Sequence, residues 1–158
     1  MATNPYARFL TDVPPWEVIE ETPGRLKFLL ERLGPKVEDV PGLNKWSARQ
    51  IMCHLTDCEI VFAYRLRQAL TEEHHVIQPF DQEKWAMHYD AFDADTALRV
   101  FTAVRDWNIR LISGLSPEHL GKKLTHPERG EMHLAVVVET MAGHDLNHLA
   151  QIEAIAGV

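Results

Sequence analysis

Residues 133–156 read HLAVVVETMAGHDLNHLAQIEAIA, and this stretch decides the fold. Its apolar side chains recur at the three- and four-residue steps that place them on one face of a helix: Val137, Met141, Ile152 and Ile155. The valine run at 136–138 is the clearest β-branched run of the chain, but helical periodicity flanks it on both sides. We therefore predict one helix over about 133–156.

Three earlier stretches have the same apolar period and predict helices over about 16–33, 47–70 and 95–114. Ser47 is a good N-cap for the second of these helices. Thr22-Pro23 has the composition of a cap followed by a first-turn proline, which would restart the first helix after a short leading turn.

Two connections between these helices, 71–94 and 116–132, are longer than ordinary turns. Strand signals are almost absent from the whole chain, so both connections are expected to lack strands. The simplest packing is an all-α fold, a four-helix bundle with crossover connections. Because 158 residues is a usual size for one domain, we expect a single helical domain over 1–158.

Histidines are unusually frequent, with nine in the chain, and two of them lie on the apolar face of the last helix. His144 and His148 are four residues apart, so their rings lie over one another at about 6 Å along the helix axis. Two imidazoles from one helix make only a weak metal site, and His54 on the second helix is the obvious third ligand.

The other six histidines are weaker candidates. His133 shares a face with His144 but lies about 16 Å away along the helix, too far to share an ion. The remaining five fall in connections or at helix ends, where we expect solvated side chains or local hydrogen bonds: His74, His75, His88, His119 and His126.

Composition excludes several classes of function. The net charge is −7 and no cluster of Lys and Arg is present, which disfavours nucleic acid as a partner. No stretch has the about 20 apolar residues of a membrane span, and no signal peptide is recognisable, so we expect no membrane partner and a cytoplasmic protein. Cys53 and Cys58 fall about 140° apart on one helix, which disfavours a disulfide between them.

Two sequence signatures resemble those of the DinB-like (DinB/YfiT-like) superfamily, whose members are described as metal-dependent enzymes. One is Trp46-Ser47 followed by His54-Leu55, and the other is the segment 144–152, which reads HDLNHLAQI. The resemblance implies a four-helix bundle that is often dimeric, so a homodimer is expected. It also implies a divalent metal held by three histidines, which match His54, His144 and His148.

Three imidazoles leave at least one coordination position open, as catalytic metal sites do. The ion could activate a low-molecular-weight thiol that attacks a small-molecule electrophile, and the resemblance favours this S-transferase chemistry modestly. It could instead activate water for hydrolysis. There are two further alternatives. One is a non-catalytic, stress-associated protein with a structural ion, and the other is a helical bundle with an inert polar core and no metal. Zinc or nickel suits imidazole ligands best.

Five side chains are candidates for a supporting role, either around the metal or toward the substrate: Asp57, Cys58, Arg65, Arg105 and Asp145. Cys58 could be a fourth ligand that closes the site, although a small core residue is the preferred interpretation. The two aspartates could orient imidazoles or be solvated. Each arginine could pair with a substrate carboxylate, but snorkelling or an interhelical ion pair is the favoured role. Glu59 lies opposite His54 and is expected at the surface or an interface.

Overall fold

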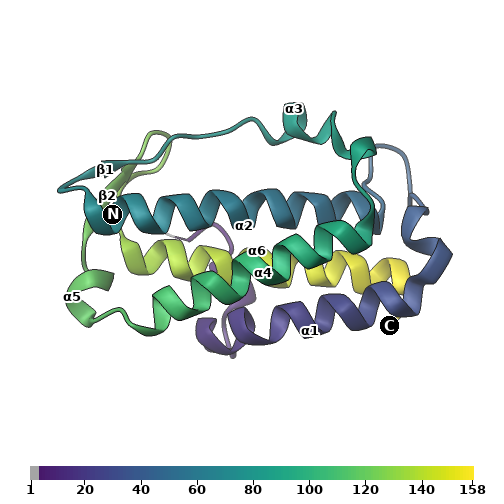
Figure 1. Cartoon of the computed structure of the whole chain (residues 1–158), viewed down its shortest axis with the longest axis horizontal. Coiled ribbons are helices and arrows are strands. Elements are labelled where there is room, and N and C mark those ends of the chain that lie inside the picture. The colour runs from purple at the N-terminus through teal and green to yellow at the C-terminus, as the bar shows by residue number, and fades with distance from the viewer. Residues whose placement is uncertain (1–3) are drawn as a thin grey trace.

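Four long helices form the protein in a computed structural model that describes residues 4–158 (Figure 1). They are α1 (Pro15–Leu33), α2 (Ala48–Thr71), α4 (Ala94–Ser113) and α6 (Leu134–Ala156). Every boundary lies within one residue of the predicted one, and the run 136–138 is helical as expected. The predicted four-helix bundle is confirmed. None of the helices in the described part of the chain is both long and apolar enough to span a bilayer.

The helices pack in a ring, in which α2 contacts α4 and α6, and α1 contacts the same two helices. Figure 1 shows that α2 and α4 run in the same direction, so the chain between them travels back along the outside of the bundle. This crossover contains α3 (Gln82–Ala86) and the 3-10 turn η3 (Tyr89–Ala91). Shorter turns, η1 (Ala7–Phe9), η2 (Gly34–Glu38) and α5 (Pro117–Leu120), complete the helical elements.

Three short strands lie in the two long connections, where the sequence analysis expected none. The strand β1 (His75–Val76) pairs in parallel with β2 (Lys123–His126), which pairs antiparallel with β3 (Gly130–His133). The expectation was wrong because strands of two and four residues are too short to display the alternation that reveals a strand. The small sheet ties the crossover to the β2–β3 hairpin at one end of the bundle.

The first helix is continuous through Pro23 rather than restarting there. A proline inside a helix cannot donate to the carbonyl four residues earlier, which here belongs to Ile19. That carbonyl instead accepts a hydrogen bond of 3.0 Å from Nη1 of Arg105 on α4. A side chain from a neighbouring helix thus replaces the missing backbone bond.

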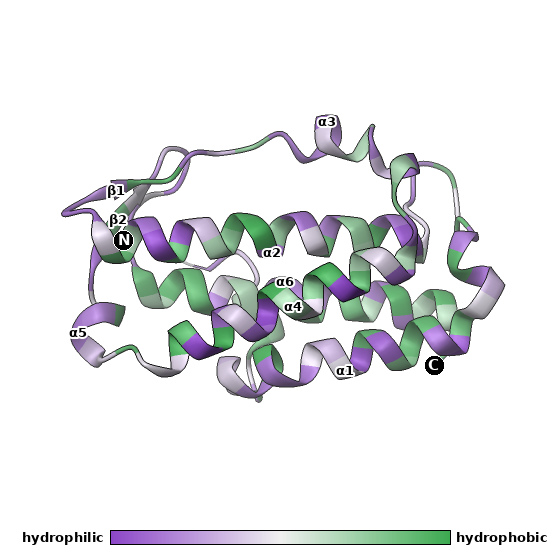
Figure 2. Cartoon of the chain, viewed as in Figure 1, coloured by the Kyte–Doolittle hydropathy of each residue, from purple (hydrophilic) through white to green (hydrophobic). Residues whose placement is uncertain are grey.

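A layer of buried polar side chains crosses the middle of the bundle and separates two apolar clusters. On α2, one cluster includes residues up to Leu55 and the other begins at Cys58. On α6, which runs the opposite way, the residues up to Ala142 belong to the second cluster and those from Leu149 belong to the first. Figure 2 shows hydrophobic and hydrophilic residues alternating along the long helices, as amphipathic helices require. The histidines singled out from the sequence belong to the polar layer.

Candidate metal centre

Three imidazoles converge between α2 and α6. His54, His144 and His148 are 2%, 5% and 7% exposed, respectively. Nε2 of His54 lies 3.1 Å from Nε2 of His144, and the ring of His148 lies 4.8 Å and 4.5 Å from those two rings, centre to centre. Antiparallel packing of α2, which begins with a capping box, against α6, which has no side-chain N-cap, brings these residues together across about 90 positions of sequence.

Burial keeps these imidazoles neutral. It lowers the pKa of His54 to about 3 and that of His148 to about 4, and it lowers the pKa of His144 well below its ordinary value. The proximity of the rings to one another acts in the same direction for His54 and His144. Neutral imidazole is the form that binds a metal.

The surroundings of His148 fit a bound divalent ion. Nδ1 of His148 lies 2.9 Å from Oε1 of Gln151, so Nδ1–H donates to the amide and the lone pair of Nε2 remains free for a metal. The Nδ1 atom of His144 is buried without a hydrogen-bond partner. Two nitrogen ligands of a tetrahedral zinc ion lie about 3.3 Å apart, close to the distance between His54 and His144.

Cys58 lies against His54, one turn along α2. Its Sγ is 3.6 Å from Nε2 of His54, and one ligand atom each from His54, Cys58 and His144 fit within 4.8 Å of one another. A sulfur and a nitrogen on one tetrahedral zinc ion are separated by about 3.6 Å. Burial raises the pKa of the thiol, so Cys58 is a neutral thiol unless a metal deprotonates it. Both buried cysteines are free, as the sequence predicted.

The carboxylate beside His144 belongs to a different network. Asp145 is fully buried and accepts hydrogen bonds of 2.7 Å and 3.2 Å from the guanidinium of Arg105. The same guanidinium donates to Glu59 at 2.8 Å, and Asn108 donates to the other oxygen of that carboxylate. Arg105 is therefore part of an interhelical ion-pair network, which was the favoured interpretation of its role.

Glu59 corrects an expectation, because it is 1% exposed rather than at the surface. Asp145 bonds to Arg105 rather than to an imidazole. Asp57 is half-buried, burial raises its pKa, and no hydrogen bond among residues 4–158 joins it to one of the three histidines. Of the remaining candidates, Arg65 lies farther along α2 and donates to the carbonyl of Gln78 at 3.3 Å.

The weaker histidines stay outside the cluster. His75 and His126 are buried, yet both make local bonds: His75 lies 2.6 Å from a Glu72 oxygen, and His126 accepts from the backbone of Glu128. His133 lies 2.8 Å from the carbonyl of Gly121. The bonds of His75 and His126 are the local hydrogen bonds expected from their positions, whereas that of His133 reaches a residue twelve positions earlier.

Two aromatic contacts to the cluster were not predicted. The ring of Tyr6 meets His144 edge-on at 5.4 Å, and the ring of Trp46 lies 5.1 Å from that of His54. A Cβ on Gly143 would stand 2.6 Å from Cβ of Tyr6, so only glycine permits this approach. A glycine in the middle of a helix was the signal that another segment passes closely there.

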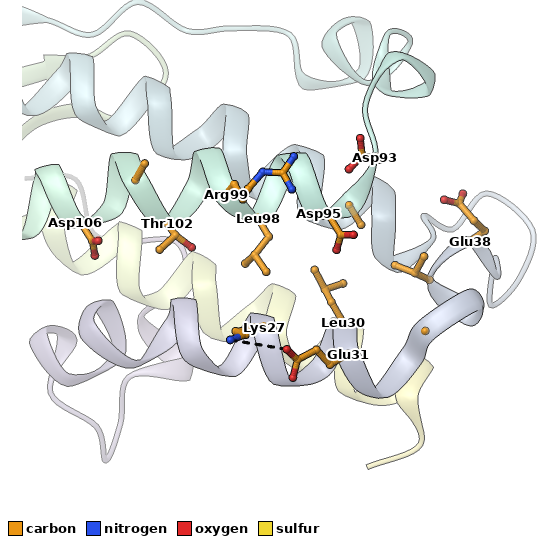
Figure 3. A pocket seen from close by; sticks show the side chains of 14 residues that line it. Lys27, Leu30, Glu31, Glu38, Asp93, Asp95, Leu98, Arg99, Thr102 and Asp106 are labelled. Carbon is orange, nitrogen blue, oxygen red and sulfur yellow. Dashed lines mark ion pairs between the residues drawn. The ribbon is translucent and has the colours of Figure 1, made fainter.

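Two hollows bear on where a substrate could bind. One of about 860 Å³ lies between α1 and α4, with Leu30 and Leu98 inside it (Figure 3). It contains none of the predicted site residues. A second, of about 540 Å³, is lined by Trp46, His148 and Gln151 among others, so it reaches the imidazole cluster.

Comparison with known proteins agrees with this architecture. A family model described as the DinB superfamily matches residues 19–152. A Bacillus cereus (strain B4264) relative named "Putative metal-dependent hydrolase" is 32% identical over 155 residues, covering 95% of this chain and 90% of the relative. A Bacillus mycoides (strain KBAB4) relative of the same description is 31% identical over 87% of this chain and 80% of its own length. The solved structure of YfiT from Bacillus subtilis, described as "a probable metal-dependent hydrolase with an unusual four-helix bundle topology", matches with a TM-score of 0.79 and 20% identity, over 99% of this chain and 90% of YfiT.

Proposed function

The chain belongs to the DinB superfamily, and from this premise we propose that it is a metal-dependent hydrolase whose divalent ion is held by His54, His144 and His148. The observation that carries the proposal is the convergence of three buried, neutral imidazoles, one of which borders a cavity. The printed names of the relatives support the hydrolase class.

The proposed donor set leaves Cys58 off the ion, although its Sγ lies within ligand distance of His54 and His144. Three imidazoles occupy three positions of a tetrahedral ion and leave one for water or substrate. A divalent ion in such a site supplies Lewis acidity, which generates a nucleophile from water near neutral pH. Zinc or nickel is the proposed ion, because borderline-soft metals prefer imidazole nitrogen.

The protein's own residues prepare the site. Gln151 accepts from Nδ1 of His148 and fixes which nitrogen faces the ion. Trp46 covers the ring of His54, and Tyr6 covers that of His144. These aromatic contacts shield the buried imidazoles, and the cavity beside His148 reaches the same cluster.

Metal content and hydrolysis test the proposal together. We would load the wild type and the variants His54→Ala, His144→Ala and His148→Ala with zinc, remove free metal, and measure zinc per chain by mass spectrometry. The exposed His88 provides the matched control, His88→Ala. One ion per chain is expected in the wild type and the control, and at least a tenfold weaker affinity in the three variants.

The wild type and the control should hydrolyse members of a panel of p-nitrophenyl esters and amides, and the three variants should not. A chelator should abolish the hydrolysis. Full zinc content in all three variants would overturn the proposed ligand set. If the three histidine variants lose zinc but the wild type hydrolyses no member of the panel, the metal site stands and the hydrolase assignment is overturned.

Activation of a small thiol is the second candidate function. The observation that favours it is the Sγ atom of Cys58, which lies 3.6 Å from Nε2 of His54, so a sulfur atom packs beside the imidazoles and its removal in Cys58→Ala would leave space for a small thiol. Cobalt-substituted protein distinguishes the candidates, because a thiolate ligand produces an intense charge-transfer band. If a small thiol binds, the band appears on adding it to Cys58→Ala protein; if water alone is activated, no band appears.

A further inference from the structure

Arg65 is a half-buried arginine without a carboxylate partner. Its Nε is buried with no hydrogen-bond partner, and its guanidinium has one hydrogen bond, to the carbonyl of Gln78 at 3.3 Å. Within residues 4–158, no ion pair includes Arg65. By contrast, Arg49 and Arg105 each contact two carboxylates. Burying an unpaired charge is unfavourable, so this position calls for an anion.

The guanidinium belongs to the same side of α2 as the metal cluster. At about 100° per residue, Arg65 falls within about 20° of both His54 and Cys58. Helical side chains lean toward the N-terminus of their helix, which here is the direction of the imidazoles. The ring of Phe80 lies 5.9 Å from the guanidinium carbon.

A second guanidinium approaches from the β2–β3 hairpin. Arg129 lies in the turn that Gly130, with φ of +84°, allows to close. Ile77 donates its N–H to the carbonyl of Thr125 on β2 at 2.8 Å, and its neighbour Gln78 accepts from Arg65, so the hairpin lies against the segment that contacts Arg65. Burial lowers the pKa of Arg65 and the positive charge of Arg129 adds to the lowering, in agreement with this placement.

We propose that Arg65 and Arg129 form an anion-binding subsite about three turns of α2 from His54, on the side of the helix that carries the imidazoles, and that this subsite holds the carboxylate or phosphoryl group of a small substrate. Guanidinium groups bind both oxyanions through paired N–H donors, and the free Nε–H of Arg65 provides one such donor. The apolar ring of Phe80 would contact the body of the substrate. The substrate class rests on the proposed function, since the anionic group would anchor a molecule whose scissile bond faces the metal.

Binding of unreactive anions tests the subsite separately from the metal. The probes are benzoate and phenylphosphonate, with benzyl alcohol as the neutral counterpart, titrated into nitrogen-15-labelled protein in the zinc-loaded and the chelated form. NMR reports both the affinity and the Nε–H signal of Arg65. The variants are Arg65→Gln and Arg129→Gln, with the exposed Arg110→Gln as the control that changes net charge equally.

At least one anion should bind both forms of the wild type and shift the Arg65 Nε–H signal, while benzyl alcohol should not. Arg65→Gln should weaken anion binding at least tenfold. Arg129→Gln should weaken it about threefold, because Arg129 is exposed, and Arg110→Gln less than twofold. The tighter of the two anions identifies the group that the subsite prefers. Equal binding by all variants, or no anion binding by the wild type, would overturn the subsite.

Anion binding that requires zinc and ignores Arg65→Gln would place the anion on the metal, overturning the subsite but not the proposed function. Conversely, anion binding that depends on Arg65 in protein that never binds zinc would retain the subsite and overturn the proposed function.

Discussion

Replacing Arg105 with methionine tests whether the buried network holds the bundle together. The change removes two hydrogen bonds to Asp145, one to Glu59 and one to the carbonyl of Ile19. Both carboxylates are 1% exposed, so they would remain buried with their charge uncompensated. Breaking such a buried pair costs about 3–5 kcal/mol. For a chain of this size, that lowers the melting temperature by about 6–20 °C.

The measurement is urea-induced unfolding followed by circular dichroism on chelated protein, so that metal binding does not contribute. Arg110→Met on the exposed side of α4 is the control, with an expected change below about 0.5 kcal/mol. Adding Glu59→Gln and Asp145→Asn to the Arg105→Met protein should recover much of the loss, because neutral amides are less costly to bury than unpaired carboxylates. A loss below about 1 kcal/mol for Arg105→Met would refute the reasoning.

Three further predictions concern the metal centre. The chelated protein should lose stability as the pH falls from about 6.5 toward 4. The folded-state pKa values of His54 (about 3) and His148 (about 4) lie below the value in the unfolded state, so the unfolded state binds more protons in this range. Urea titrations should show up to about 1.4 kcal/mol per pH unit for each histidine, whereas a flat profile would contradict the buried neutral imidazoles. Gly143→Ala should destabilise the protein by about 1–3 kcal/mol and speed tryptic cleavage near the displaced N-terminal segment. Adding Tyr6→Gly should recover part of the loss, and unchanged unfolding and cleavage in Gly143→Ala would argue against the close contact. Cys58→Ala should keep one zinc ion per chain with affinity within about threefold in a chelator competition, because three imidazoles suffice; a loss of 100-fold or more would identify the thiolate as a ligand.

Local signals account for the part of the fold that could be predicted. The N-cap at Ser47 is a capping box with Gln50, and such a motif acts within one turn of helix. The apolar period of α6 likewise depends on neighbours three and four residues away. These features placed both helices within one residue, and with them His54 and His144 on facing sides.

Long-range packing explains what could not be predicted. The position of Glu59 was judged from the face that carries His54, yet α2 packs on both α4 and α6 and therefore has two buried sides. The contact of Tyr6 with His144 joins opposite ends of the chain, and no local pattern specifies it. Gly143 hinted at a close approach but not at which segment makes it.

X-ray absorption at the zinc edge of the loaded protein tests the central claim most directly, because it reports the number and type of ligand atoms. The proposed site predicts three imidazole nitrogens at about 2.0–2.1 Å, one further light atom, and no sulfur. A sulfur shell at about 2.3 Å in the wild type that disappears in Cys58→Ala would contradict an open site formed by His54, His144 and His148.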